Sequence, residues 1–332
     1  MEGDGSACEV GMKPRSNSRV FWIAACVLAL AALPATAQDL ASFEKKVTEH
    51  KLANGLTFLI YERPEAPVVS FFTYAGVGAA QEVPGITGMA HMFEHMAFKG
   101  TTTIGTNDWP AEQKALQKVD ETYHAYDDAR QKVGGKDPAK LDELKKAWKD
   151  AQEAADKFIV KNEFGEIIDR EGGVGMNAGT SADQTVYFYS LPANKVELWA
   201  HLESERFLDP VFREFYKERD VIMEERRLRT ESQPIGRLIE QFSAVAFQAH
   251  PYHQPVVGYM SDLASFSRED ADRFRRTYYV PSNLVISPMS ESARVRMTTR
   301  FELCRSTIFR MTDCGGGSLH TITPTRPVTS SR

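Results

Sequence analysis

The chain lacks cysteine over almost its whole length. Its four cysteines, Cys8, Cys26, Cys304 and Cys314, all lie near the two ends of the 332 residues. The long stretch between Cys26 and Cys304 can therefore form neither a disulfide nor a thiolate metal site. A metal site in the body of the chain would need histidine and carboxylate ligands.

The chain also lacks an excess of positive charge. It has 40 Lys and Arg against 45 Asp and Glu, for a net charge of -5. This balance gives no basic surface of the kind that neutralises nucleic-acid phosphates, so nucleic acid is not an expected partner. A composition of 42% hydrophobic and 26% charged residues excludes a disordered or collagen-like chain. Small molecules, peptides and proteins remain as candidate ligands.

Long apolar runs are lacking too. The run at residues 20–33 is too short to span a bilayer, but it follows three basic residues and precedes the small-residue site Ala35-Thr36-Ala37. This order is typical of a secretory signal peptide, which we expect at residues 1–37. A buried N-terminal helix and a lipoprotein acylated at Cys26 are the alternatives. The signal peptide predicts a secreted or periplasmic protein with no stable membrane span after cleavage.

The other end differs in composition from the rest of the chain. Residues 288–332 contain fourteen Ser or Thr, seven Arg and no Lys, without a sustained period of 2 or 3.6. We interpret this segment as a tail from a shifted reading frame or a truncated gene; an ordinary disordered tail is the alternative. The folded domain is therefore expected at residues 38–287.

The pattern in this body predicts an α+β fold with a mixed or antiparallel sheet packed against helices. Strands are expected at residues 52–61, which contain the turn Asn54-Gly55, at 67–77, within 172–189 and at 283–286. Helices are expected at residues 89–99, 195–207, 213–230, 236–248 and 270–279.

An inserted helical hairpin is expected at about residues 108–163. Residues 110–132 and 139–161 read as two long charged helices, and residues 134–138 between them supply a glycine stop, an aspartate N-cap and a proline. The apolar residues of both helices recur at spacings of three and four, which predicts an antiparallel pair.

The segment His91-Met-Phe-Glu94-His95 places two imidazoles four residues apart on one face of a helix. At this spacing both can reach one Zn²⁺, at nitrogen–metal distances of about 2.1 Å. Glu94 beside them can take a proton from a zinc-bound water, the general-base role in metal-assisted hydrolysis. Two surface histidines on an ordinary helix are the alternative interpretation.

A catalytic zinc ion normally has three protein ligands, so a third must come from elsewhere. Glu218 and Glu225 are seven residues apart and share a helix face, whereas Glu224 is turned about 100° away. Glu225 is the candidate ligand, and Glu218 could orient a ligand histidine. Taken alone, such acids more often form a solvated helix face, because helices rich in Glu and Arg are common.

Several motifs in order resemble the N-terminal catalytic half of the insulinase or pitrilysin family of zinc peptidases. These inverted zincins include the mitochondrial processing peptidases. The motifs are KLANGL at 51–56, GITGMAHMFEHMAFKGT at 85–101, MNAGTS at 176–181, ERDVIMEE at 218–225 and HPY at 250–252. The resemblance covers most of residues 47–286.

The resemblance implies one zinc ion on His91, His95 and Glu225, with Glu94 as the general base and Glu218 as a supporting carboxylate. It implies a zinc endopeptidase that acts on extended peptides. It also implies that Asn177 and Ala178 lie on an edge strand to which the peptide substrate adds as a further strand.

Enzymes of this family enclose the substrate with a second half of similar fold, and this sequence ends before such a half. A separate subunit that supplies it and a fragment that keeps only the metal site are both open interpretations. Two other functions are considered. A lyase with the same inverted motif would need a cysteine as third ligand, which the core lacks; a non-peptidase homologue or partner subunit would have a structural role.

Overall fold

The computed structural model describes residues 40–62, 67–132 and 137–290. The predicted signal peptide at residues 1–37 and the predicted tail from residue 291 onwards lie outside the described residues. Residues 1–46 form one unit, whose described part holds the short helix α2, Leu40–Glu44. The described residues from Val47 onwards belong to a second unit, an α+β domain.

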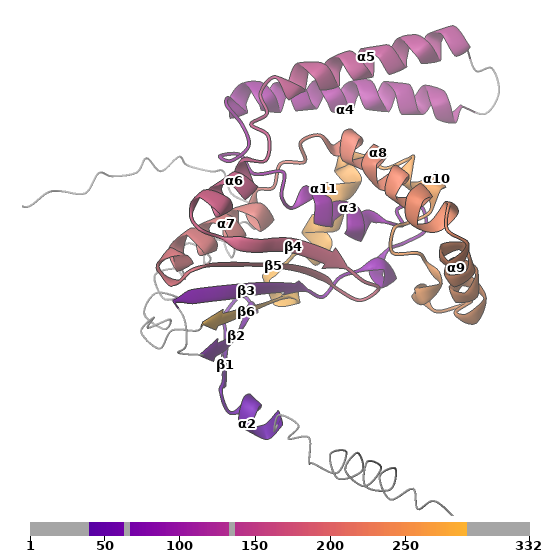
Figure 1. The fold of residues 1–332 in the computed structure, drawn as a ribbon. Coiled ribbons are helices and arrows are strands. Elements are labelled where there is room, and N and C mark those ends of the chain that lie inside the picture. The colour runs from indigo at the N-terminus through magenta and orange to yellow at the C-terminus, as the bar shows by residue number, and fades with distance from the viewer. Residues whose placement is uncertain (1–39, 63–66, 133–136, 291–332) are drawn as a thin grey trace, which may run out of the picture. The chain divides into compact units, whose positions relative to one another are not determined.

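A mixed sheet of six strands organises this domain (Figure 1). The strands follow the order β1-β2-β6-β3-β5-β4, and β2 with β6 is the parallel pair. Their bounds are Val47–Lys51 for β1, Thr57–Glu62 for β2, Val68–Ala75 for β3, Val174–Thr180 for β4, Thr185–Pro192 for β5 and Leu284–Ser290 for β6. The predicted α+β class is confirmed, and β4 lies at one edge of the sheet.

One face of the sheet packs against helices. Residues of β5 alternate between buried and half-buried, as expected of a strand with one face in the core. Phe71 of β3 stacks on Trp199 of α7, with 4.1 Å between the ring centroids. Figure 1 shows α3, α6, α7 and α11 over this face. The predicted metal-binding motif on α3 therefore lies on the helical side of the sheet.

The helices of the body are short to medium in length. Their bounds are Met89–Met96 for α3, Glu163–Arg170 for α6, Val196–Leu208 for α7, Phe215–Arg226 for α8, Pro234–Ala246 for α9, Met260–Leu263 for α10 and Arg268–Tyr278 for α11. None of the helices in the described part combines the length and the apolar character needed to cross a membrane.

The inserted hairpin consists of α4, Trp109–Gln131, and α5, Pro138–Asp156. Asp108 and Asp137 cap the two helices by accepting hydrogen bonds from backbone N–H groups. Trp148 of α5 lies 5.1 Å from the Tyr216 ring of α8, measured between ring centroids. The hairpin is thus anchored to the helix that carries Glu225.

Two predicted helices end earlier than expected. Helix α3 ends at Met96 instead of residue 99, because the N–H of Lys99 bonds the carbonyl of Met96 in a tighter turn. Helix α5 ends at Asp156 instead of residue 161, because Val160 N–H bonds the Gly105 carbonyl at the base of the hairpin. The residues after Asp156, which were expected to continue α5, lead instead into the short helix α6, which was not predicted.

Two further boundaries differ. Helix α8 ends at Arg226, and a π-helical turn, Arg227–Glu231, continues the expected helix. Strand β6 extends to Ser290, past the expected domain boundary at residue 287. The prediction stopped at residue 287 because the composition changes from residue 288 onwards, with many Ser, Thr and Arg and no Lys. In the structure the strand continues, and the Ser287 hydroxyl next to Pro288 donates to the Leu59 carbonyl of β2.

Candidate metal centre

The start of α3 is fixed by a glycine and a buried carboxylate. Gly88 has φ +94°, and a Cβ there would lie 2.6 Å from the Val257 carbonyl oxygen, so only glycine fits without strain. Glu82 accepts hydrogen bonds from the N–H groups of Gly88 and Ala90, each at 2.7 Å. Burial raises the pKa of Glu82 to about 8. These contacts set where the helix begins and which side chains it turns inward.

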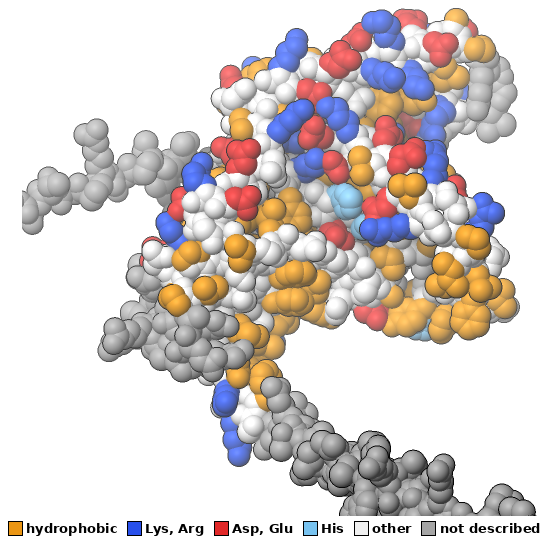
Figure 2. All heavy atoms as spheres, viewed as in Figure 1, with side chains coloured by type: hydrophobic (Ala, Val, Ile, Leu, Met, Phe, Trp, Pro, Cys, Tyr) orange, Lys and Arg blue, Asp and Glu red, His pale blue; other side chains and the backbone are white. Residues whose placement is uncertain are grey.

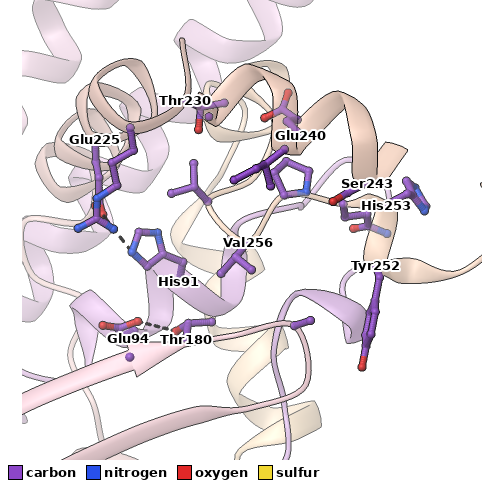
Figure 3. A pocket seen from close by; sticks show the side chains of 18 of the residues that line it. His91, Glu94, Thr180, Glu225, Thr230, Glu240, Ser243, Tyr252, His253 and Val256 are labelled. Carbon is purple, nitrogen blue, oxygen red and sulfur yellow. Dashed lines mark hydrogen bonds and ion pairs between the residues drawn. The ribbon is translucent and has the colours of Figure 1, made fainter. Parts of the chain in front are cut away.

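The apolar face of α3 is buried, which leaves the histidines facing a pocket of about 930 Å³ (Figure 3). The buried apolar residues are Met89, Met92, Phe93 and Met96. His91, Glu94 and His95 all line the pocket. The sequence spacing predicted this division of the helix into an inner face and a polar face.

His91, His95 and Glu225 converge at one point. Glu225 Oε2 lies 3.7 Å from His91 Nε2 and 3.8 Å from His95 Nε2. One ligand atom from each of the three residues lies within 4.8 Å of the other two. Two ligands of a tetrahedral zinc ion are about 3.4 Å apart, so only small movements separate this arrangement from a coordination sphere.

The donor set fits a zinc ion. Burial, followed by the nearby His95 and Arg229, lowers the pKa of His91 to about 3, so this imidazole is neutral at physiological pH. A neutral imidazole is the form that binds metal. Two imidazole nitrogens and one carboxylate oxygen are a ligand set of catalytic zinc sites. The three residues could therefore hold Zn²⁺ and leave a position open.

Helix α8 aims Glu225 at the histidines because its neighbours on the helix are anchored elsewhere. Ile222 is fully buried, and Arg226 Nη1 donates to the Gly258 carbonyl at 2.8 Å. The other carboxylate oxygen of Glu225 pairs with Arg229 Nη1 at 2.5 Å. Glu224 pairs with Arg227 and its side chain is 64% exposed. The structure thus brings Glu225 to the histidines and leaves Glu224 at the surface.

Glu218 lies behind His95, as its spacing from Glu225 predicted. Its Oε2 is 3.3 Å from His95 Nδ1, and its Oε1 accepts a hydrogen bond from Lys99 Nζ at 2.5 Å. Burial acts to raise the pKa of Glu218, but the hydrogen bonds from His95 and Lys99 outweigh it and lower the pKa to about 2. An ionised carboxylate here favours a proton on His95 Nδ1 and leaves Nε2 facing Glu225.

Glu94 has a partner on the edge strand. The Thr180 hydroxyl donates to Glu94 Oε2 at 2.5 Å. Burial raises the pKa of Glu94, and the Thr180 hydrogen bond partly opposes that shift. A carboxylate whose pKa is raised towards neutrality is a stronger proton acceptor, which suits a general base.

Asn177 and Ala178 lie where the resemblance placed them. Both belong to β4, which pairs with β5 on one side and forms the sheet edge on the other. Both line the pocket that contains His91 and Glu94. Backbone groups of an edge strand can pair with an added strand, so this side of the pocket can hold an extended chain.

Three features of the pocket were not predicted from the sequence: Thr180, Arg229 and the wall formed by α9. Thr180 stands within the quoted motif MNAGTS, so the motif was a usable signal for it. Arg229 follows Glu225 by one helical turn, and that spacing was a signal as well. The position of α9 at the pocket depends on the direction of the chain after Glu231, and no sequence motif there predicts that direction.

Comparisons with known proteins agree with this geometry. The family model described as "Insulinase (Peptidase family M16)" matches residues 57–128, which include His91, Glu94 and His95. The "Zinc protease PqqE" of Helicobacter pylori is 28% identical over 278 residues, covering 83% of this chain and 49% of that protein. The chain is therefore similar to the insulinase family of peptidases. The beta subunit of the mitochondrial-processing peptidase of Lentinula edodes is also similar to this chain, 23% identical over 254 residues, covering 76% of this chain and 42% of that protein.

Solved structures of proteases share the fold of this chain. "The crystal structure of a protease from Helicobacter pylori" superposes with a TM-score of 0.58 at 25% identity, covering 84% of this chain and 53% of that one. The first half of the periplasmic protease PqqL from Escherichia coli has the same fold, with a TM-score of 0.54 at 20% identity, covering 85% of this chain and 50% of that one. The chain spans about half the length of the curated relatives it matches.

Proposed function

We propose that this chain is the catalytic half of a zinc-dependent endopeptidase that hydrolyses extended peptides. The observation that carries the proposal is the convergence of His91, His95 and Glu225 beside Glu94 in one pocket. The names of the relatives, which include zinc proteases, support a zinc ion at this point. The chain matches only about half the length of these relatives, which supports a second half or a separate subunit as a partner.

In this proposal His91 Nε2, His95 Nε2 and a Glu225 oxygen hold one zinc ion. When bound, zinc supplies Lewis-acid activation of water and of the peptide carbonyl. Glu218 holds His95 in the orientation and tautomer that metal binding needs. Arg229 pairs with the Glu225 oxygen that does not face the histidines and so helps orient that carboxylate.

The residues of the chain divide the remaining work. The edge strand at Asn177 and Ala178 holds the substrate backbone as an added strand. Glu94 removes a proton from the attacking water as the new C–O bond forms, and later gives this proton to the leaving amine as the C–N bond breaks. The Thr180 hydroxyl keeps the Glu94 carboxylate in place during both transfers.

Two further parts of the proposal concern where the chain works. A signal peptide at residues 1–37 would direct the protein to a secreted or periplasmic location. The peptidase domain, expected from residue 38, would comprise the unit that begins at Val47 and includes β6, with the hairpin of α4 and α5 as an insertion. A partner subunit with a structural role is the second candidate function, and the half-length match to the relatives favours considering it.

Metal analysis and peptide cleavage by purified variants test the proposal. Glu94→Gln should keep one zinc ion per chain and lose hydrolysis, measured by mass spectrometry of a peptide pool. His91→Ala and Glu225→Gln should lose both zinc and hydrolysis, because each removes a ligand. Glu224→Gln is the matched control and should change neither. Retained cleavage by Glu94→Gln would contradict the role of Glu94, whereas zinc binding by the unchanged chain without any hydrolysis would favour the structural role.

A further inference from the structure

The inserted hairpin of α4 and α5 buries only one side of each helix. Figure 2 shows acidic and basic side chains mixed over the place that the hairpin occupies in Figure 1, as expected of a solvated surface. Its buried residues are Glu112, Leu116, Val119 and Tyr123 of α4 and Trp148, Ala151 and Ala155 of α5. A contribution of the hairpin to the rest of the domain is therefore expected from this buried side.

Aromatic side chains of the hairpin enclose Arg219 of α8. The guanidinium carbon lies 5.3, 5.6 and 5.0 Å from the ring centroids of Tyr123, Trp148 and Tyr216. Nη1 of Arg219 donates hydrogen bonds to the Tyr123 hydroxyl and to the Phe266 carbonyl, each at 3.0 Å. Arg219 is only 6% exposed. A buried cation costs free energy unless its surroundings compensate the lost water, and the hairpin supplies two of the three rings and one of the two oxygens that do so.

Arg219 shares α8 with two carboxylates of the metal centre. Glu218 precedes it directly and Glu225 follows it by six residues, so both carboxylates point about 100–120° away from Arg219 around the helix axis. One face of this 12-residue helix therefore packs on the hairpin while another faces the histidines of α3. A movement of α8 relative to the hairpin moves Glu218 and Glu225 relative to the histidines, and a metal ligand tolerates a displacement of only about 0.5 Å.

The residues just before α8 are tied to the hairpin as well. Both carboxylate oxygens of Glu112 in α4 accept hydrogen bonds from Arg213, from Nε at 2.6 Å and from Nη2 at 3.1 Å. Both side chains are almost completely buried. Arg213 also donates to the carbonyls of Lys99 and Ile104, in the segment that follows α3. The hairpin thus contacts the start and the middle of the segment that carries Glu225, and Arg213 connects it to the segment after the histidine helix.

We propose that the inserted hairpin positions the side of α8 that faces the metal centre, and that Arg219 is the positioning residue through which it does so. Tyr123 and Trp148 hold Arg219 in place. The helix in turn holds Glu218 and Glu225 where they meet the histidines. The inference rests on the proposed zinc site, and it gives a task to an insertion that the proposed function leaves without one.

The zinc affinity of the full chain, measured by competition with a chelator of known affinity, tests this inference. Arg219→Met removes the charge and keeps an unbranched side chain, and Tyr123→Phe removes only the hydroxyl that binds Arg219. Zinc affinity should fall about tenfold in Arg219→Met and about threefold in Tyr123→Phe, the size of effect that changes in a packed network have on a connected site. In the chain saturated with Co²⁺, Arg219→Met should also change the visible absorption bands, because these report the arrangement of the ligands around the ion.

Tyr126→Phe is the matched control. Tyr126 also belongs to α4, and its ring stacks on Trp148 with 5.5 Å between the centroids, but the hydrogen bond from Arg219 goes to Tyr123. The control should leave zinc affinity and the cobalt spectrum unchanged. Thermal unfolding of each metal-free variant, followed by circular dichroism, is measured alongside. A residue that acted on stability alone would lower the unfolding midpoint and leave the zinc affinity of the folded chain and the cobalt spectrum as they are.

The outcomes separate this inference from the function on which it rests. Unchanged zinc affinity in both Arg219→Met and Tyr123→Phe would overturn the positioning role and leave the proposed peptidase function standing. An equal loss of affinity in Tyr126→Phe would overturn it too, because any loosening of the hairpin would then suffice. If Arg219→Met does not fold, Tyr123→Phe decides. Failure of the unchanged chain to bind zinc would overturn the metal centre and this inference together.

Discussion

The α3 and α8 side of the pocket places its polar side chains among buried neighbours, whereas α9 on the other side buries none of its residues. On the first side, three polar residues of the candidate site have a side-chain partner: Glu218 for His95, Thr180 for Glu94 and Arg229 for Glu225. His91 differs from them, because its buried Nδ1 atom has no hydrogen-bond partner among the described residues and only packing holds the ring. On the second side, an ion pair joins Glu240 of α9 to Arg226 of α8.

This difference corresponds to the parts that the two sides take in the proposed chemistry. A metal site and a general base need positions held to within a fraction of an ångström, and paired, buried neighbours provide this. Helix α9 contributes none of the predicted metal ligands, so its residues can vary without loss of the metal site. We therefore expect substitutions on the first side to change zinc binding or chemistry, and substitutions on the second to leave zinc binding largely as it is.

Arg226 links the two sides, and its replacement should have the largest effect on the α9 wall. Arg226→Met leaves the half-buried Glu240 carboxylate without its cation, and removal of one partner from a buried pair costs about 3 kcal/mol. Hydrogen exchange of the α9 backbone amides should become about 100-fold faster at that cost. Zinc affinity should fall much less, because the hydrogen bonds of Arg226 go to Glu240 and to the Gly258 carbonyl, and the buried Ile222 still anchors α8 next to Glu225.

Arg227→Met is the control for this prediction. Arg227 is the next residue along the chain, but its side chain is 45% exposed and pairs with exposed Glu224. Surface pairs of this kind contribute at most about 1 kcal/mol, so α9 should exchange as in the unchanged chain. Equal exchange in both variants, or loss of zinc in Arg226→Met, would show that the two sides are not separate in the way proposed.

Glu218 should have the next largest effect, this time on the metal side. Glu218→Gln weakens the support of His95 Nδ1, and loss of such a carboxylate lowers metal affinity about 10-fold to 100-fold. Competition with a chelator of known zinc affinity measures the change. Glu214→Gln is the matched control, since Glu214 also binds Lys99, at 3.2 Å, and has no hydrogen bond to the histidine. If both variants lost affinity equally, the charge near Lys99 would matter and the contact with His95 would not.

The fold could be predicted from the sequence wherever local patterns decide structure. The turn at Asn54-Gly55 and the hairpin of α4 and α5 were predicted correctly because turn and cap residues act within a few positions. The ends of α3 and α5 were wrong by three and five residues: α3 closes in a tighter turn from Lys99 to Met96, and α5 stops where Val160 makes a long-range backbone contact with Gly105. The predicted strand ended before Pro288, whereas β6 continues to Ser290, because its pairing with β2 and β3 involves residues far away in the sequence.

The same division holds for the site. The pairs His91 with His95 and Glu218 with Glu225 follow from helix periodicity, so their relative positions were predictable. That the two helices meet, so that Glu225 faces both rings, was implied by the family resemblance and not by spacing. The contact of Thr180 with Glu94 depends on the position of β4 at the sheet edge, and the pairing of Arg226 with Glu240 depends on the path of the chain after α8.

Thr180 should show the smallest of these effects, and it concerns pH. The Thr180 hydrogen bond lowers the pKa of Glu94 against the larger effect of burial, so its loss in Thr180→Val should raise that pKa further. A general base must be ionised, so the acid limb of the pH profile of kcat/KM should move to higher pH, with little change on the alkaline side. Zinc affinity should stay the same, because Thr180 is not a predicted ligand. Thr180→Ser keeps the hydroxyl and should restore the original profile. A uniform loss of rate at every pH in Thr180→Val, without movement of the acid limb, would mean that Thr180 acts through the shape of the edge strand and not through Glu94.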